Sequence, residues 1–157
     1  MKIRVSYFYQ IRNFKKNMIP MSTALGDPIW YHENGDKSSI YIDKRGIING
    51  LRLLPIINAA KLTCASACPL CEDKNPDTCL WKNEYREALE TIDFDSMMKG
   101  IKQFVDDYCK KHKIIEEPIA VLMVHESPTN ACSERYPLID YFCSHGIDCK
   151  ELDYPIE

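Results

Sequence analysis

The sequence lacks any long apolar run. The longest one, at residues 119–124, has six residues, whereas a helix that spans a bilayer needs about 20. The first ten residues also lack the apolar stretch of roughly 7 to 15 residues and the small-residue cleavage site that make a secretory signal. We therefore expect a cytosolic protein with no membrane partner.

Cysteine is too sparse for a small disulfide scaffold. Eight cysteines among 157 residues fall below the density of about 8–10% that is typical of such scaffolds. Thiols in the cytosol stay reduced, so these cysteines are interpreted as thiols or as metal ligands. The length, with 45% hydrophobic and 27% charged residues, is that of an ordinary folded domain, and we predict a single domain over residues 1–157.

A large excess of positive charge is also missing. The formal net charge of −3 excludes a generally basic nucleic-acid binder. The first 26 residues nevertheless contain no acidic residue and five basic ones, which are Lys2, Arg4, Arg12, Lys15 and Lys16. This segment either forms a patch that faces phosphate or nucleic acid or is a solvated stretch with scattered basic side chains.

The spacing of apolar residues predicts an α/β fold. Alternating or continuous apolar stretches predict strands at 2–7, 19–23, 39–42, 119–124 and 149–154. Helical spacing predicts helices over 79–91 and 133–146, and a third helix that Asp93 or Asp95 caps and that ends in the basic run 110–113. The strand, helix, strand order at 119–154 indicates a partly parallel sheet.

Four cysteines lie close together in the sequence. Cys64, Cys68, Cys71 and Cys79 follow the pattern C-x3-C-x2-C-x7-C in a stretch that contains two prolines. Thiolates favour tetrahedral zinc, and a shell closed by four of them is structural because it leaves no position open for water. We therefore predict a metal-binding loop at residues 64–79 that holds structural zinc.

Two alternatives stay open for this loop. Thiolates also hold iron–sulfur clusters, and C-x3-C-x2-C is the triplet of radical enzymes, although those enzymes use a long repeated βα barrel and two adjacent helices follow here. The loop could instead bind no metal, and reversible oxidation of its thiols would make the protein a redox sensor. Three further cysteines, Cys109, Cys143 and Cys149, are interpreted as core residues.

The segment after residues 119–124 is the best candidate for an active site, because open α/β sheets bind ligands at the carboxyl ends of their strands. Cys132 falls near the start of the next helix, where backbone N–H groups stabilise a thiolate. Arg135 could hold an anionic group there. Glu126 and His125 lie on the same loop and could transfer protons.

A purely structural interpretation of this segment stays open as well. The cysteine would then pack as a small apolar residue, and Ser133 or Asn130 would cap the helix. Arg135 would pair with one of two acidic residues, Glu134 or Glu151.

Several short motifs occur in an order that is typical of one bacterial family. They are Ser6-Tyr-Phe8, Ile19-Pro-Met-Ser22 with Asp27-Pro-Ile-Trp30, Leu54-Pro55, Thr78-Cys-Leu-Trp81 with Tyr85 and Leu89, and Glu126 through Cys132 to Glu151-Leu152. On these motifs, which extend over nearly the whole chain, the sequence resembles the YeaO-like proteins, the bacterial family of unknown function numbered four-eight-eight. The resemblance is greatest to a short branch found in phages and anaerobes.

This resemblance implies a small Rossmann-like α/β domain. The family signature is a strand that ends in Cys-x-Glu, followed by Cys-His-Arg at the start of a helix. Here Val124 replaces the first cysteine, Glu126 is kept, and Cys132-Ser-Glu-Arg135 takes the place of Cys-His-Arg. The family's histidine is therefore missing from this chain.

The resemblance also implies a substrate class and a pocket. Its suggested chemistry acts on a nucleotide or on a base of nucleic acid. Ser6, Ser22, Trp30 and Ser133 would line the pocket, and the indole of Trp30 could stack on a base.

Two functions of different class follow. In the first, the protein is a small enzyme in which Cys132 is the nucleophile, Glu126 transfers protons and Arg135 holds an anionic group of the substrate. In the second, the protein is a non-catalytic module in which a zinc-stabilised loop and the basic first segment bind nucleic acid or another protein. The missing histidine favours the second function, whereas the thiol at a helix start favours the first.

Overall fold

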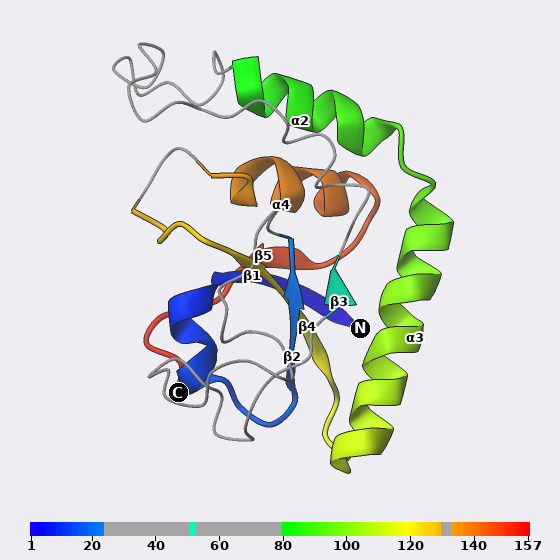
Figure 1. The fold of residues 1–157 in the computed structure, drawn as a ribbon, viewed down its shortest axis with the longest axis vertical. Coiled ribbons are helices and arrows are strands. Elements are labelled where there is room, and N and C mark those ends of the chain that lie inside the picture. The colour runs from blue at the N-terminus through cyan, green and yellow to red at the C-terminus, as the bar shows by residue number, and fades with distance from the viewer. Residues whose placement is uncertain (24–50, 53–79, 130–132) are drawn as a thin grey trace.

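The computed structural model describes residues 1–23, 51–52, 80–129 and 133–157. Helices and strands alternate along these segments (Figure 1). In chain order they are β1 (Lys2–Tyr7), the short 3-10 helix η1 (Phe8–Asn13), β2 (Met18–Ser22), β3 (Leu51–Arg52), α2 (Leu80–Glu90), α3 (Phe94–His112), β4 (Ile119–Val124), α4 (Arg135–Ser144) and β5 (Cys149–Glu151). The strand predicted at 39–42 lies outside the described residues.

The described strands form one sheet in the order β3-β2-β4-β1-β5, and every neighbouring pair is parallel. β4 and β1 lie at its centre, where Lys2 is paired with Ile119 and Tyr7 with Val124. The predicted α/β class is confirmed, and the described part of the sheet is more uniformly parallel than expected. The arrangement is compatible with a Rossmann-like fold.

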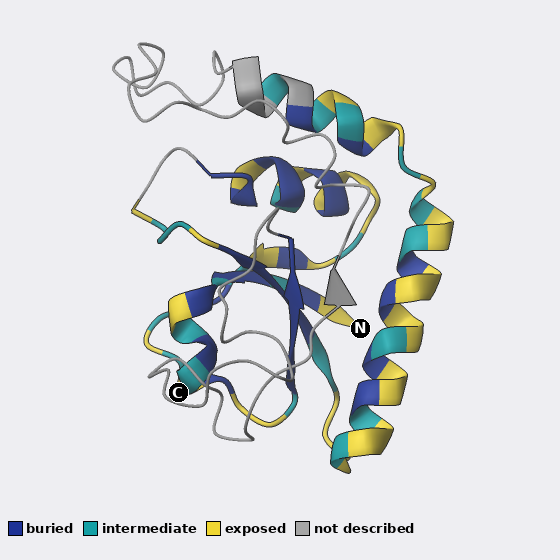
Figure 2. Cartoon of the chain, in the orientation of Figure 1, coloured by how far each residue is buried: buried dark blue, intermediate teal, exposed yellow. Residues whose placement is uncertain are grey.

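Side chains that alternate along the strands build two separate apolar layers. Ile3, Val5, Ala120 and Leu122 face a core that also contains apolar residues of α2, α3 and α4. The residues between them on β4, such as Val121, face a second core formed with η1 and the end of the chain. Since successive side chains of a strand point to opposite faces, the continuous apolar run at 119–124 reflects a strand that is covered on both sides. Figure 2 shows β2 and most of β4 coloured as buried.

The helix α3 follows the sequence prediction closely. Asp93 is its N-cap and accepts a hydrogen bond from the Ser96 backbone N–H at 3.0 Å. The buried residues of its inner stripe include Ile101 and Val105. The helix ends at Lys113, whose φ of 54° places it in the left-handed region, and the basic run 110–113 therefore lies at a helix end as expected.

Three predictions are corrected in detail. The last helix begins at Arg135 rather than at Ser133, and β5 ends at Glu151 rather than at residue 154. Cys143 is exposed, so it is not a core residue, whereas Cys149 is buried as predicted. Cys143 lies in the last turn of α4, where its thiol donates a hydrogen bond to the carbonyl oxygen of Cys149 at 3.1 Å.

Among the described residues no helix is long and apolar enough to cross a membrane.

Candidate active site

The carboxyl ends of β1, β2, β4 and β5 meet at one edge of the sheet. In the strand order, β3 lies beside β2 toward one edge of the sheet, whereas β5 lies beyond β4 toward the other edge. Such a change of direction between adjacent strands leaves a crevice beyond their carboxyl ends, which is where open α/β sheets bind ligands. The residues that follow β2 and β4, and the start of α4, therefore mark the candidate site.

Two acidic side chains lie at this edge. Glu126 comes two residues after β4 and accepts a hydrogen bond from the Ser133 hydroxyl at 3.2 Å. Glu134, the N-cap of α4, is only 8% exposed. Its burial, and next the negative charge of Glu126, raise the pKa of Glu134 from its ordinary 4.5 to about 7.

Thr23 connects β2 to this acidic pair. Its backbone N–H and its hydroxyl both donate to the carbonyl oxygen of Met123, at 3.1 Å and 3.0 Å. Its side chain also makes a hydrogen bond with Glu134. The end of β2 and the start of α4 are thereby brought together beyond the end of β4.

The guanidinium of Arg135 is buried and bonded within the protein. The residue is 2% exposed. Its Nε donates to the Ser133 hydroxyl at 3.4 Å, one terminal nitrogen donates to Glu151 Oε1 at 3.2 Å, and the other donates to the backbone carbonyl of Glu126. The pairing with Glu151 is one of the two that the structural interpretation of this segment predicted.

A chain of hydrogen bonds continues from Arg135 to β1. Glu151 Oε1 also accepts from the Tyr154 hydroxyl at 2.7 Å, and that hydroxyl is 2.8 Å from the Ser6 hydroxyl. Burial raises the pKa of Glu151. The start of α4, the residues around Glu151 and β1 are thus connected to the loop that carries Glu126.

Tyr85 of α2 approaches the acidic pair from the helical side. The residue is 1% exposed. Its pKa is raised well above the ordinary value, first by burial and then by the charges of Glu134 and Glu126. Tyr85 is thus a buried residue of α2 whose phenol experiences the charges of both carboxyl groups.

The structure brings together only part of the predicted site. Glu126, Ser133 and Arg135 lie side by side, and Ser6 joins them through Glu151 and Tyr154. His125 instead packs against the ring of Phe8, with ring centroids 4.9 Å apart, and Ser22 is buried at the end of β2. Cys132, Trp30 and the four clustered cysteines Cys64, Cys68, Cys71 and Cys79 lie outside the described residues.

Four further residues belong to this site and were not predicted as functional. Glu134 was interpreted only as a partner for Arg135, and Tyr85 only as part of a helical stripe. Thr23 and Tyr154 were not predicted, because the contacts that bring them to the site, with Met123 and Ser6, join residues about a hundred or more positions apart in the chain. A threonine directly after a predicted strand is the one local feature that could have indicated this edge.

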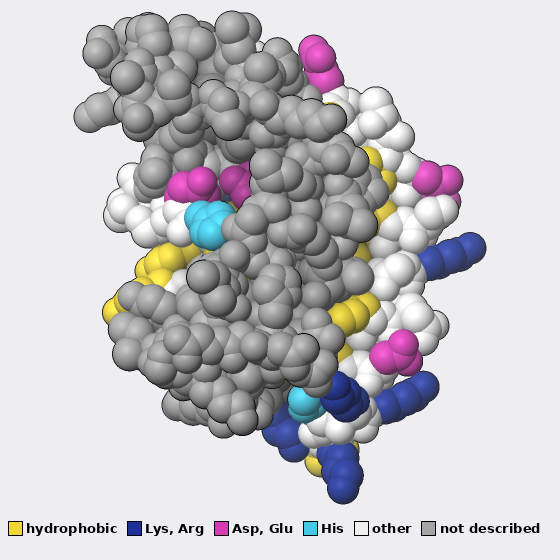
Figure 3. All heavy atoms as spheres, in the orientation of Figure 1, with side chains coloured by type: hydrophobic (Ala, Val, Ile, Leu, Met, Phe, Trp, Pro, Cys, Tyr) yellow, Lys and Arg dark blue, Asp and Glu magenta, His cyan; other side chains and the backbone are white. Residues whose placement is uncertain are grey.

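Figure 3 shows acidic side chains beside a histidine on the face near the start of α4. Among the described residues, no group of three or more His, Cys, Asp and Glu side chains is placed to hold a metal ion. In its described part, the candidate site contains the Glu126–Glu134 pair, hydroxyl groups and the Arg135–Glu151 ion pair.

Comparison with known proteins identifies no relative of this chain: no protein-family model, no curated protein and no solved structure matches it.

Proposed function

We propose that the protein is a small enzyme that acts on a nucleotide or on a base of nucleic acid at the carboxyl edge of β2 and β4. The observation that carries this proposal is the buried acid Glu134. A carboxyl group with a pKa of about 7 is half protonated near neutral pH, which is the condition for an efficient general acid or base. Perturbed carboxyl groups in such a crevice are a common property of active sites.

In the proposed reaction the thiol of Cys132 is the nucleophile, and the carboxyl groups of Glu134 and Glu126 provide the proton transfer. Cys132 precedes Glu134 by two residues, and its thiolate would add to an electrophilic ring carbon of a base. The electron pair of the C=N bond moves to the ring nitrogen, which takes the proton of Glu134. Glu126, with a charge that keeps Glu134 protonated, supports this role.

An activity screen with matched variants tests the proposal. The protein is incubated with nucleotides, nucleosides and short DNA and RNA oligonucleotides, and products are identified by mass spectrometry. Cys132→Ala and Glu134→Gln should each lower turnover at least about 100-fold. Cys143→Ala, which removes an exposed thiol, is the matched control. Full activity of Cys132→Ala would exclude the thiol mechanism, and full activity of Glu134→Gln would exclude the carboxyl group.

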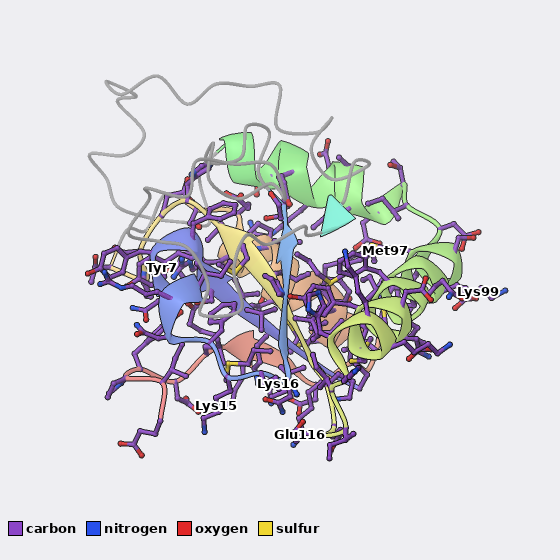
Figure 4. All side chains as sticks on the ribbon, turned by 60° about the horizontal axis from the view of Figure 1, so that its bottom comes forward. Tyr7, Lys15, Lys16, Met97, Lys99 and Glu116 are labelled. Atoms are coloured by element: carbon purple, nitrogen blue, oxygen red, sulfur yellow. The ribbon has the colours of Figure 1, made fainter. Side chains whose placement is uncertain are left out.

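A second function, a zinc-stabilised module that binds nucleic acid, is favoured by a separate observation. The basic first segment and the basic end of α3 meet at the opposite, amino edge of the sheet. Lys16 Nζ donates to the carbonyl oxygen of Lys113 at 3.1 Å, and the Ile119 backbone N–H donates to the Asn17 carbonyl oxygen at 2.9 Å. In Figure 4, Lys15 and Lys16 lie near Glu116 at this end.

The salt dependence of binding tests this second function. Affinity for labelled DNA and RNA is measured by fluorescence anisotropy at several salt concentrations. If lysines at this edge contact phosphate, Lys15→Gln should lower the slope of log affinity against log salt by about 0.9. Lys99→Gln, on α3 and apart from this edge (Figure 4), is the control. Binding that does not change with salt would exclude phosphate contacts.

Both proposed functions include a zinc site in the loop at 64–79. Its proposed ligands are Cys64, Cys68, Cys71 and Cys79. The chemistry of the donors supports zinc, since four thiolates at close spacing form a closed tetrahedral shell. An iron–sulfur cluster and a redox-sensing role are the competing proposals. The YeaO-like family, a Rossmann-like fold and a phage or bacterial context likewise remain proposals that the motifs support.

A further inference from the structure

Two cysteines are in contact where α4 ends and β5 begins. Sγ of Cys143 donates a hydrogen bond to the carbonyl oxygen of Cys149 at 3.1 Å. Between them the chain reverses at Gly146, whose φ of 76° is a conformation that glycine adopts without strain. The Gly146 N–H donates to the Cys143 carbonyl oxygen at 3.0 Å. The backbone of this turn therefore holds the two cysteines together.

One thiol of this pair is accessible and the other is buried. Cys143 is exposed, whereas Cys149 is 5% exposed and lies in the core that α4 covers, together with Phe142. Burial, and next the thiol of Cys143, raise the pKa of Cys149 to about 12. Since the charge of one sulfur acts on the other, the two sulfur atoms lie near each other as well as the Cys149 carbonyl.

These cysteines join α4 to β5 at one end of the helix. At the other end, Arg135 forms an ion pair with Glu151 at 3.2 Å. The contact between Cys143 and Cys149 is weaker, because a thiol is a poor hydrogen-bond donor. A bond between the two sulfur atoms would replace this weak contact by a covalent one and would fix both ends of α4 to the same strand.

We propose that Cys143 and Cys149 form a site of reversible oxidation, at which a small disulfide such as oxidised glutathione links the two sulfur atoms. This site is separate from the candidate active site and from the proposed zinc loop, and it does not depend on the proposed function. In a reducing compartment such a bond is transient and typically serves redox sensing.

The reaction consists of two thiol–disulfide exchanges. The exposed Cys143 thiolate attacks one sulfur of oxidised glutathione, the glutathione S–S bond breaks, and one glutathione leaves as a thiolate. The Cys149 sulfur then attacks the Cys143 sulfur of this mixed disulfide. Its proton goes to solvent, and the second glutathione leaves as a thiolate. The two cysteines lose two electrons and two protons, and oxidised glutathione becomes two glutathione thiols.

A titration with glutathione tests the site. Reduced protein is incubated without oxygen in mixtures of reduced and oxidised glutathione for hours, because the raised pKa of Cys149 slows the second exchange. Free thiols are then blocked with N-ethylmaleimide, and tryptic peptides are weighed by mass spectrometry. Residues 136–150 form one tryptic peptide with both cysteines and no other. Oxidation should leave this peptide unblocked and two hydrogens lighter. The peptide with Cys109, a half-buried thiol, should stay blocked and is the control.

Two variants test the order of the exchanges. In Cys149→Ala, Cys143 should stop at the mixed disulfide with glutathione. In Cys143→Ser, Cys149 should stay unmodified, because it is buried and protonated. Glutathione bound to Cys149 in Cys143→Ser would contradict this order. Cys143→Ser alters an exposed position, so it remains informative if circular dichroism shows that Cys149→Ala is unfolded.

The same titration in urea shows whether the folded contact matters. If the fold holds the two thiols together, the equilibrium constant for the internal disulfide should be at least about tenfold larger in native protein than in urea, because a cross-link that the fold accommodates stabilises it. An equal or larger constant in urea would overturn the proposal. A wild-type peptide that stays blocked at every glutathione ratio, or that stops at the mixed disulfide, would overturn it too.

Discussion

At the scale of single residues, burial has opposite consequences for two charged side chains that are adjacent in the sequence. Glu134 is buried without a full ion-pair partner, so the protein holds it in the protonated form to a higher pH. Arg135 is buried more completely, yet it stays charged because Glu151 and two further oxygen acceptors compensate the lost hydration. Glu134 is therefore suited to exchange a proton near neutral pH. Arg135 instead holds the loop that carries Glu126 in place.

The pKa of Glu134 predicts how stability depends on pH. Between its ordinary value of 4.5 and about 7, the folded protein keeps a proton that the unfolded chain has released. The free energy of unfolding should therefore fall as pH rises through this range, by at most about 1.4 kcal/mol per pH unit from this group. Urea unfolding followed by far-UV circular dichroism measures this dependence.

The matched variant isolates the contribution of this one group. Glu134→Gln cannot ionise, so its stability relative to wild type should increase with pH up to about 7 and then stay constant. Glu116→Gln should show a constant difference. A stability difference for Glu134→Gln that does not change with pH would mean that Glu134 is not buried as the structure shows.

A second prediction concerns the ion pair of Arg135. Arg135→Met should lower the free energy of unfolding by about 3 kcal/mol, because it leaves Glu151, which is 25% exposed, without its partner. Arg4→Met is the matched control, since Arg4 of β1 also forms an ion pair, but with Asp148 just before β5, which is 59% exposed and can be hydrated by water. Chemical denaturation of both variants should show the larger loss for Arg135→Met, and equal losses would contradict the role of burial.

The sequence could predict only the local part of this site. Glu126, Ser133 and Arg135 were identified because they follow the end of β4 at Val124 closely in the sequence. Glu151 was foreseen as a partner of Arg135 on charge alone. Tyr154 and Thr23 could not be predicted, because parallel pairing brings them to the edge from distant segments, and sequence spacing contains no information on such contacts.

At the scale of elements, the strength of a local signal decided how well each boundary was predicted. Asp93 starts α3 where it was expected, since an aspartate that precedes an amphipathic stripe is a strong cap. The start of α4 was placed two residues early. The Ser133 hydroxyl accepts a hydrogen bond from the Arg135 backbone N–H, but Ser133 lies before the N-cap, which is Glu134, and its hydroxyl also bonds the side chains of Glu126 and Arg135. Ser133 therefore combines a local contact at the helix start with tertiary contacts that the sequence does not reveal.

The end of α3 provides a prediction at this scale. Lys113 has a φ of 54° and a ψ of 49°, a conformation that costs a residue with a Cβ about 1 kcal/mol and that glycine adopts readily. Lys113→Gly should therefore stabilise the protein by up to about 1 kcal/mol. Lys102→Gly, at an exposed position in the middle of α3, should destabilise it by a similar amount. Thermal unfolding compares the two variants, and a loss of stability in Lys113→Gly would contradict the left-handed cap.

At the scale of the whole molecule, the described segments share one parallel sheet that is covered on both faces. β4 and β1 are neighbours at its centre, and in the chain η1 lies between β1 and β2 and α4 between β4 and β5. The α/β class could be predicted because each strand and helix has its own period. The strand order could not be predicted, because the apolar patterns of β1 and β4 contain no information on which strands pair with each other.

The proposed zinc loop supplies a prediction for the whole protein. Protein purified without oxygen should contain about one zinc per chain. The double variant Cys68→Ser, Cys71→Ser should lose the metal and unfold at a lower temperature, because zinc that binds the folded form stabilises it. Elemental analysis with an absorption spectrum measures this, with Cys143→Ser as the control. Brown, iron-containing protein would indicate a cluster instead, and colourless protein without metal would exclude the site.

The position of β4 at the centre of the sheet has a consequence for how the chain is made. β1 and β2 both pair with β4, so during synthesis the first strands leave the ribosome long before their common neighbour exists. At the usual rate of roughly 5–20 residues per second, Lys2 is synthesised several seconds before its pairing partner Ile119. Through that interval the unpaired edges of β1 and β2 are open to other chains, so the yield of folded protein should depend on the speed of translation and on chaperones that cover nascent strands.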